Sequence, residues 1–272
     1  MKKQFQDYSF LPKSYKGLFP FKICTTSFIY PDHYIPNVKM LGPYMDEIEL
    51  LLFESTGPDA LPSRSVIVQL GRLAAEFGLS YNVHLPTDIS ISDPDTVRQN
   101  DAVEALMRVI ERVQPLGPSA LILHVPYADG SLTDDKTKSW QDSVYKNLEK
   151  ILSVVENKKV IALETLEYPL ELLTAIIVDL QLSICLDLGH LIVYGYDVKE
   201  VFNKYARNAS VLHLHGVENH RDHTSLRRLS PDLTQTVLWV LKRFTGVVSI
   251  EVFSYEDLMS SLKYLENQWQ QR

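Results

Sequence analysis

The sequence has 272 residues, of which 45% are hydrophobic and 22% are charged, and its formal net charge is −7. A chain of this length and composition can bury one large core, which predicts a single domain. The negative charge disfavours a surface that attracts nucleic-acid phosphates, because such surfaces depend on clustered lysine and arginine.

Short aliphatic or β-branched runs recur along the chain after an opening segment, residues 1–20, that has no clear periodicity. We interpret 1–20 as an arm that packs on the domain or covers one end, and 21–272 as the domain itself. The runs predicted as strands are residues 23–28, 47–53, 81–85, 120–125, 160–166, 183–188, 211–214 and 247–253.

Segments with helical spacing of apolar residues separate these strands. Ser63 precedes a helix that Gly78 can end, and Asp93-Pro94 begins the next helix. Further helices are predicted at residues 138–155, 170–180, 198–205, 232–244 and 256–268. Such alternation predicts the α/β class with a parallel sheet. Eight units without a glycine-rich first turn favour closure into a (β/α)8 TIM barrel over an open doubly wound sheet.

The two cysteines, Cys24 and Cys185, are far apart in sequence and form no CxxC pair. The sequence therefore indicates neither a disulfide framework nor a thiolate zinc site. No apolar run has the character of a signal peptide or the length of a membrane span, so we expect a cytoplasmic protein without a membrane partner.

Histidines and acidic residues follow the carboxyl ends of the predicted strands, where TIM barrels place their active sites. In chain order they are Glu54, His84, His124, Glu164, Asp187, His190, His213, His215 and Glu251. Alternation along the later strands directs these side chains to one axis. Buried carboxylates repel one another, so their convergence predicts divalent metal ions among them. Mixed imidazole and carboxylate ligands favour zinc, with manganese or iron as alternatives.

Each of these residues alone also has a simpler interpretation. A single histidine such as His84 or His124 is more often a hydrogen-bonded structural residue, and Glu54 could be a solvated loop acid. Recurrence at five or more strand ends favours the metal interpretation. The chain has no G-x-S-x-G elbow, P-loop or H-E-x-x-H helix, which disfavours a serine hydrolase.

The loop at residues 216–229 adds His220, Arg221, Asp222 and His223 near the same end of the barrel. It could be an ordinary polar loop. Alternatively, His223 or Asp222 could supply another metal ligand, and Arg221 a cation that holds a phosphate group.

With Glu164, Asp187, His213 and Glu251 on its last four strands, nearly the whole chain resembles the xylose-isomerase-like superfamily of TIM barrels. This superfamily includes sugar isomerases and zinc-dependent apurinic endonucleases. The endonuclease branch has two further histidines, matched by His84 and His124, and a D-x-x-H motif, matched by Asp187 and His190. Its D-R-H-x-S-L loop is matched by His223, but Arg221 stands where the family has aspartate, so a third ion depends on Asp222 taking over.

A narrower resemblance rests on several short segments taken together. They are TTSFIYP at 25–31, ELLLFES at 49–55, VHLP at 83–86, HLHG at 213–216, RDHTSL at 221–226 and EVFS at 251–254. These segments resemble the cobamide-remodelling phosphodiesterases, which cleave the nucleotide loop of a corrinoid into cobinamide phosphate and an α-riboside. The resemblance implies a small-molecule corrinoid substrate; the residues alone imply only metal-assisted chemistry.

The resulting hypothesis is hydrolysis of a phosphodiester at two metal ions, or at three if a further metal site exists. Glu164 would bridge two ions, His84 and His124 would hold one of them, and Asp187, His213 and Glu251 the other. A third ion would use His190 and His223. His215 could replace or assist His213 and contact the substrate. Glu164, Glu251 and Arg221 are the predicted catalytic residues, with Arg221 neutralising the phosphate.

Tyr30, Glu54 and Phe253 are the remaining predicted substrate contacts, beside Phe53 in a wide, partly apolar mouth. The first alternative is a sugar or sugar-phosphate isomerase or epimerase, which has no need for His84, His124 or His223. Further alternatives are an endonuclease-like DNA repair enzyme, which fits the negative charge less well, and a non-catalytic corrinoid binder. The sequence leaves the oligomeric state open.

Overall fold

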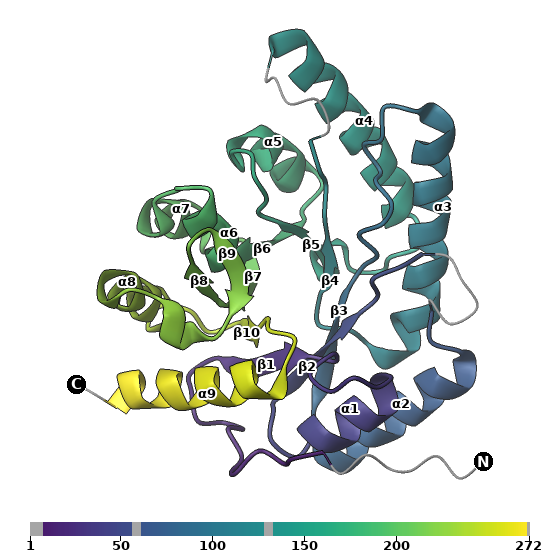
Figure 1. The fold of residues 1–272 in the computed structure, drawn as a ribbon. Helices are drawn as coiled ribbons and strands as arrows, with labels where there is room; N and C mark the ends of the chain where they lie inside the picture. Colours follow the sequence, from purple (N-terminus) through teal and green to yellow (C-terminus); the bar gives the residue numbers. More distant parts are fainter. Residues whose placement is uncertain (1–7, 56–60, 128–132, 271–272) are drawn as a thin grey trace.

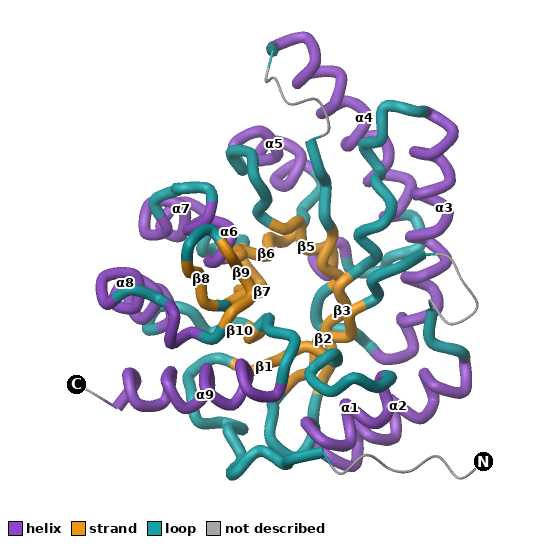
Figure 2. The backbone as a smooth tube through the Cα atoms, in the orientation of Figure 1, coloured by secondary structure: helices purple, strands orange, loops and turns teal. Residues whose placement is uncertain are grey.

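The computed structural model describes residues 8–55, 61–127 and 133–270. At its centre, eight parallel strands form a closed barrel with helices around its outside (Figures 1 and 2). Around the barrel the strands are β1 (Lys22–Thr26), β10 (Val247–Ile250), β7 (Ala209–Leu214), β6 (Ser183–Asp187), β5 (Ile161–Glu164), β4 (Leu121–Leu123), β3 (Ser80–His84) and β2 (Glu47–Leu51). The predicted single (β/α)8 TIM barrel is confirmed.

The helices outside the barrel alternate with the strands along the chain. They are α1 (Tyr34–Leu41), α2 (Arg64–Phe77), α3 (Thr96–Val113), α4 (Asp134–Leu152), α5 (Glu171–Asp179), α6 (Leu188–Val193), α7 (Val198–Tyr205), α8 (Pro231–Leu241) and α9 (Tyr255–Gln270). As predicted, Ser63 caps α2, and Gly78, with a φ of 59°, ends it. The start of α3 differs from the prediction, because Asp95, not Asp93, is the residue whose carboxylate caps it.

Two short helices and a hairpin were not predicted. The helix α1 has only eight residues and contains Pro36, so its apolar pattern is weak. The helix α6 begins directly after β6, and Asp187 both ends the strand and caps the helix by accepting a hydrogen bond from the His190 N–H at 2.8 Å. The polar segment after β7 forms a hairpin of β8 (Gly216–Glu218) and β9 (Arg221–Thr224).

The barrel interior changes character along the strand direction. A layer of small and medium apolar side chains fills its middle: Cys24, Ala120, Ile122, Ala162, Cys185, Val211 and Val247. The strand β2 directs two acids, Glu47 and Glu49, into the same interior, and both are completely buried. The predicted ligands lie towards the carboxyl ends of the strands, where the interior opens to the mouth.

The described part of the predicted arm packs along one side of the barrel. Phe19 and Phe21 stack on each other and meet the ring of Trp269 in α9 edge-on. Nearer the mouth, the Tyr255 hydroxyl donates a hydrogen bond to the Phe10 carbonyl at 2.9 Å. Figure 1 shows this segment passing beside α9. Within the described residues, no helix is both long and apolar enough to cross a membrane.

Candidate metal centre

The carboxylate of Glu164, at the end of β5, lies at the centre of the predicted ligands. Its Oε2 atom is 3.2 Å from His84 Nε2 and 3.0 Å from His124 Nε2. Its Oε1 atom is 3.3 Å from His190 Nδ1 and 3.5 Å from His213 Nδ1. The two oxygens of one buried carboxylate therefore face two different sets of side chains.

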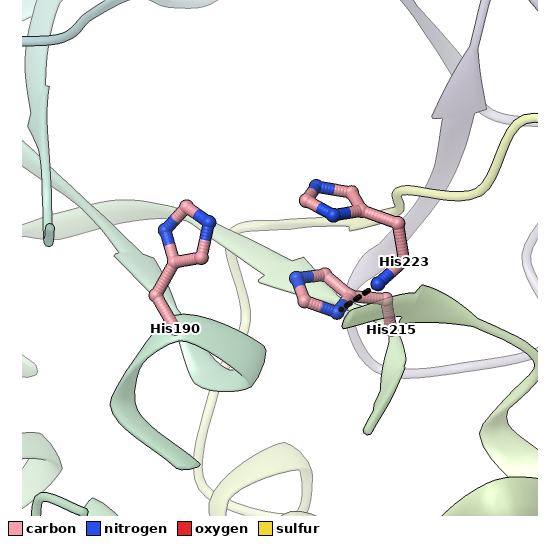
Figure 3. Close-up of side chains that lie close together, drawn as sticks. All are labelled: His190, His215 and His223. Atoms are coloured by element: carbon pink, nitrogen blue, oxygen red, sulfur yellow. Dashed lines mark hydrogen bonds between the residues drawn. The ribbon is translucent and has the colours of Figure 1, made fainter. Parts of the chain in front are cut away.

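Three groups of possible metal ligands surround this carboxylate, and in each group the ligand atoms lie within 4.8 Å of one another. The two-histidine group is His84, His124 and Glu164. The three-carboxylate group is Glu164, Asp187, His213 and Glu251. The three-histidine group is His190, His215 and His223 (Figure 3). All eight predicted metal ligands lie in these groups, because the parallel register aligns the strand ends around the axis.

A fourth combination has the thiol of Cys185, in place of Asp187 and Glu251, beside Glu164 and His213. Cys185 is completely buried beneath the other ligands, and burial raises the pKa of its thiol. Since a metal binds the thiolate, this neutral thiol is a poorer ligand than the carboxylates above it.

His213 is held so that its Nδ1 atom faces the three-carboxylate group. Its Nε2 atom lies 3.2 Å from Glu49 Oε2 on the opposite side of the ring. Nδ1 lies 3.0 Å from Glu251 Oε2, yet within the described chain neither of these two buried atoms has a hydrogen-bond partner. Two unpartnered ligand atoms beside further carboxylates fit a bound divalent cation. Of the two histidines on β7, His213 is the one with an unpartnered ring nitrogen beside the acids.

Glu49 was missed by the sequence analysis, which considered only residues at the strand ends. The alternation in Glu47-Ile48-Glu49 places both acids on one face, and this signal could have identified them. A carboxylate that accepts a hydrogen bond from one ring nitrogen of a histidine orients the other nitrogen towards a metal. Glu49 has this position relative to His213.

The acids and histidines of the centre shift one another's pKa values. Burial alone would raise the pKa of Glu164 and of Asp187, but the neighbouring histidines hold both pKa values well below their ordinary range. Burial would lower the pKa of His84 and of His190, but the carboxylates raise these pKa values to about 9 and about 10. Protonated histidines thus balance the acids, and divalent cations would replace those protons.

The β8–β9 hairpin carries His223 to the mouth. Asn219 and His220, with φ values of 53° and 60°, form a two-residue turn in the left-handed region, as in a type I′ hairpin. The register then shifts, and His223 itself has a φ of 51°. Asp222 Oδ1 lies 3.0 Å from His223 Nδ1, so Asp222 holds this histidine and does not join the ligand groups. Arg221 is exposed at the start of β9.

The other predicted substrate contacts lie in different surroundings. Tyr30 is only 3% exposed, and its hydroxyl donates to the Ser9 carbonyl at 2.7 Å, so it packs the arm on the barrel. This placement does not bring Tyr30 to the ligand groups, contrary to the expectation from sequence. Glu54 is exposed beyond the end of β2.

Three exposed phenylalanines, Phe28, Phe53 and Phe253, form an aromatic rim beside the centre. The ring centroids of Phe28 and Phe53 are 5.2 Å apart, and those of Phe53 and Phe253 are 6.3 Å apart. Phe253 stacks on His223 at 5.2 Å. Phe53 also lines a cavity of about 80 Å³ with Leu51, Leu52, His84, Thr87, His124 and Glu251. The rim is therefore continuous with the ligands.

A family profile described as "Xylose isomerase-like TIM barrel" matches residues 38–270. The chain belongs to this family. No curated protein matches the chain.

Among solved structures, a D-tagatose 3-epimerase-like protein is similar with a TM-score of 0.76, 21% identity and coverage of 92% of this chain and 97% of that chain. The IOLI protein with a bound zinc atom has a TM-score of 0.71 and 16% identity, covering 91% and 98%. Endonuclease IV from Thermus thermophilus has a TM-score of 0.69 and 17% identity, covering 92% and 100%. Other similar structures are mostly sugar epimerases by their printed names, and identities this low show only the fold.

Proposed function

We propose that this family member is a metal-dependent phosphodiesterase. The observation that carries the proposal is the position of Glu164, whose two oxygens face the two-histidine group and the three-carboxylate group separately. Two metal ions beside a phosphodiester can stabilise the attacking and the leaving oxygen of one displacement. Single-metal carbonyl chemistry gives no role to His84 and His124.

The residues of the chain divide this task between them. Glu164, His84 and His124 would hold one ion, and Glu164, Asp187, His213 and Glu251 would hold the other. Bound divalent ions supply Lewis acidity and activate water for attack on phosphorus. Arg221, exposed near His223, is the cation proposed to neutralise the phosphate oxygens.

The proposed substrate is a corrinoid whose nucleotide loop contains the scissile phosphodiester. The resemblance of the short segments to the cobamide-remodelling phosphodiesterases supports this choice. The aromatic rim also supports it, because exposed phenyl rings beside the ligands suit a large apolar molecule better than a small sugar. The net charge of −7 supports a small-molecule substrate over nucleic acid.

The test is incubation of the metal-replete protein with cobalamin, an abasic DNA duplex and a panel of ketoses, followed by mass spectrometry. We expect cobinamide phosphate and the α-riboside from cobalamin alone. Intact cobalamin after prolonged incubation would refute the proposed substrate.

Matched variants connect this reaction to the two-histidine group. His84→Asn and His124→Asn should each lower turnover by more than about 100-fold, since they remove direct ligands and even outer partners of a metal matter by 10- to 100-fold. His33→Asn is the control, because His33 is exposed at the start of α1. Unchanged turnover in His84→Asn would argue against a second ion.

A second candidate function is sugar epimerisation or isomerisation. The three-carboxylate group alone supplies four ligands for one ion, which could polarise a sugar carbonyl. Several similar structures are sugar epimerases by their printed names. Conversion of a ketose that survives His84→Asn would establish this candidate in place of the first.

A further inference from the structure

His215 differs from the other histidines of the centre in the kind of partner that holds it. Its Nδ1 atom accepts a hydrogen bond of 3.0 Å from the main-chain N–H of His223 (Figure 3). Its Nε2 atom lies 3.1 Å from Asp187 Oδ1. The ring is 1% exposed and stacks on the His223 ring at 4.2 Å. Both nitrogens therefore have fixed partners.

The partner at Nδ1 determines where the proton of His215 lies. A main-chain N–H can only donate, so Nδ1 must carry a lone pair. In a neutral imidazole the proton is then on Nε2, which donates to Asp187. Since a metal binds only an unprotonated nitrogen, neither nitrogen of His215 is open to an ion.

The two neighbouring histidines have the opposite arrangement. His190 Nδ1 lies 3.1 Å from the Thr165 carbonyl oxygen, and His223 Nδ1 lies 3.0 Å from an Asp222 oxygen. These partners only accept, so the neutral form of each ring carries its proton on Nδ1 and keeps on Nε2 the lone pair that a metal requires.

We infer that His215 is a positioning residue that orients Asp187, and that within the three-histidine group only His190 and His223 can bind an ion. The inference rests on the metal centre of the proposed function but does not depend on which reaction occurs there. It also separates the two strand-seven histidines, because His213 Nδ1 faces the acids without a hydrogen-bond partner, whereas both ring nitrogens of His215 have partners.

Gly189 supports a precise placement of the His215 ring. A Cβ atom at residue 189 would lie 1.9 Å from His215 Cε1 and 2.4 Å from both ring nitrogens. The ring therefore rests directly on the backbone of α6, between Gly189 and the ring of His223. Any other residue at 189 would displace His215 from Asp187.

The direct test is the tautomer of His215 in the zinc-loaded protein, read by long-range ¹H–¹⁵N correlation spectra of histidine-labelled protein. The His215 signals are assigned as those lost in His215→Asn. We expect a protonated Nε2 and a bare Nδ1. A metal-bound Nε2 would overturn the inference, and this measurement uses no substrate, so it stands apart from any failure of the proposed reaction.

Two substitutions separate the two hydrogen bonds. His215→Gln can keep a donor towards Asp187, whereas His215→Asn can keep only an acceptor for the His223 N–H. Both variants should bind the wild-type number of metal ions at saturation. His215→Asn should lower metal affinity or kcat by about 10- to 100-fold with little change in KM, and His215→Gln should restore much of this. Loss of one metal equivalent in both variants would show that His215 is a ligand.

Gly189→Ala provides an independent variant that keeps every histidine. It should reproduce the weakened affinity of His215→Asn, with circular dichroism as the check that the barrel is folded. A folded Gly189→Ala protein with wild-type metal affinity would contradict the positioning role.

Discussion

The strand β2 directs one acid to each end of the barrel interior, and the two acids have very different surroundings. Towards the amino ends of the strands, Glu47 accepts hydrogen bonds from Asn82 at 3.0 Å and from the hydroxyls of Ser80 and Ser119. It also lies 3.4 Å from Lys22 Nζ. Protein donors and a lysine therefore satisfy this carboxylate completely.

At the mouth, Glu49 belongs to a layer that lacks such donors. In the part of the chain that the structure describes, Glu49 Oε1, His213 Nδ1 and Glu251 Oε2 are buried without a hydrogen-bond partner. A buried polar atom without a partner is costly, and a divalent cation among these acids would supply the missing partner. Both oxygens of Glu47, by contrast, accept hydrogen bonds from the chain.

The largest loss of metal binding and turnover is expected from Glu164→Gln. This substitution changes the carboxylate that the two-histidine group and the three-carboxylate group share. Metal content should fall at both positions, and turnover should drop by more than about 100-fold, beyond the effect of losing an outer partner. Elemental analysis and turnover measure this. Retention of the full metal content would mean that Glu164 does not bridge.

A smaller loss of metal binding is expected from substitutions of Glu49. Glu49→Leu removes the acceptor of His213 Nε2 and should weaken metal binding by about 10- to 100-fold, measured by competition with a chelator. Glu49→Gln keeps an oxygen acceptor and should show a smaller loss. Equal losses in the two variants would assign the effect to charge instead of orientation.

At the amino end of β2, Glu47→Ala should lower the free energy of unfolding without changing metal binding. It leaves the donors of Asn82, Ser80 and Ser119 unpartnered, which costs about 1–3 kcal/mol for a buried group. Urea denaturation measures this loss, and metal content should remain that of the wild type. Reduced metal content in folded Glu47→Ala protein would show that the two layers are coupled.

The smallest and most gradual effect is the pH dependence of stability that the titratable groups of the metal centre contribute. In metal-free protein the raised pKa values of His84, His190 and His223, at about 9 to 10, contribute stability that is complete below the ordinary pKa of 6.5. This stability is lost as the pH rises through 9 to 10. The lowered pKa of Glu164 contributes above about pH 4.5 and is lost in acid.

Metal ions reverse the alkaline part of this profile, because they require unprotonated histidines. Metal-free protein should therefore melt at its highest temperature between about pH 4.5 and 6.5, whereas the gain from saturating zinc should grow as the pH rises towards 9. Thermal denaturation with and without a chelator compares the two. A zinc-induced gain that is constant over this range would exclude proton displacement from the histidines.

The strand ends and the candidate ligands were predictable because each predicted strand has its own apolar run and each strand after the first has its own terminal His, Asp or Glu. The inward positions of Glu47 and Glu49 also follow from alternation. They were missed because only residues at the strand ends were considered as candidates. The partner of His215 could not be predicted, since it is a main-chain N–H whose position depends on the left-handed conformation of His223. The hairpin was missed because its strands are short and polar, and the burial of Tyr30 depends on the distant arm.

Closure of the barrel joins strands from opposite ends of the described chain, since β1 pairs with both β2 and β10. Contacts between segments so distant in sequence form slowly, because the chain must first lose the entropy of a long loop. The three-carboxylate group is complete only when β10 has brought Glu251 beside β7. Metal uptake during refolding should therefore lag behind the recovery of the helical circular dichroism signal. A bound ion would slow the opening of the closed barrel.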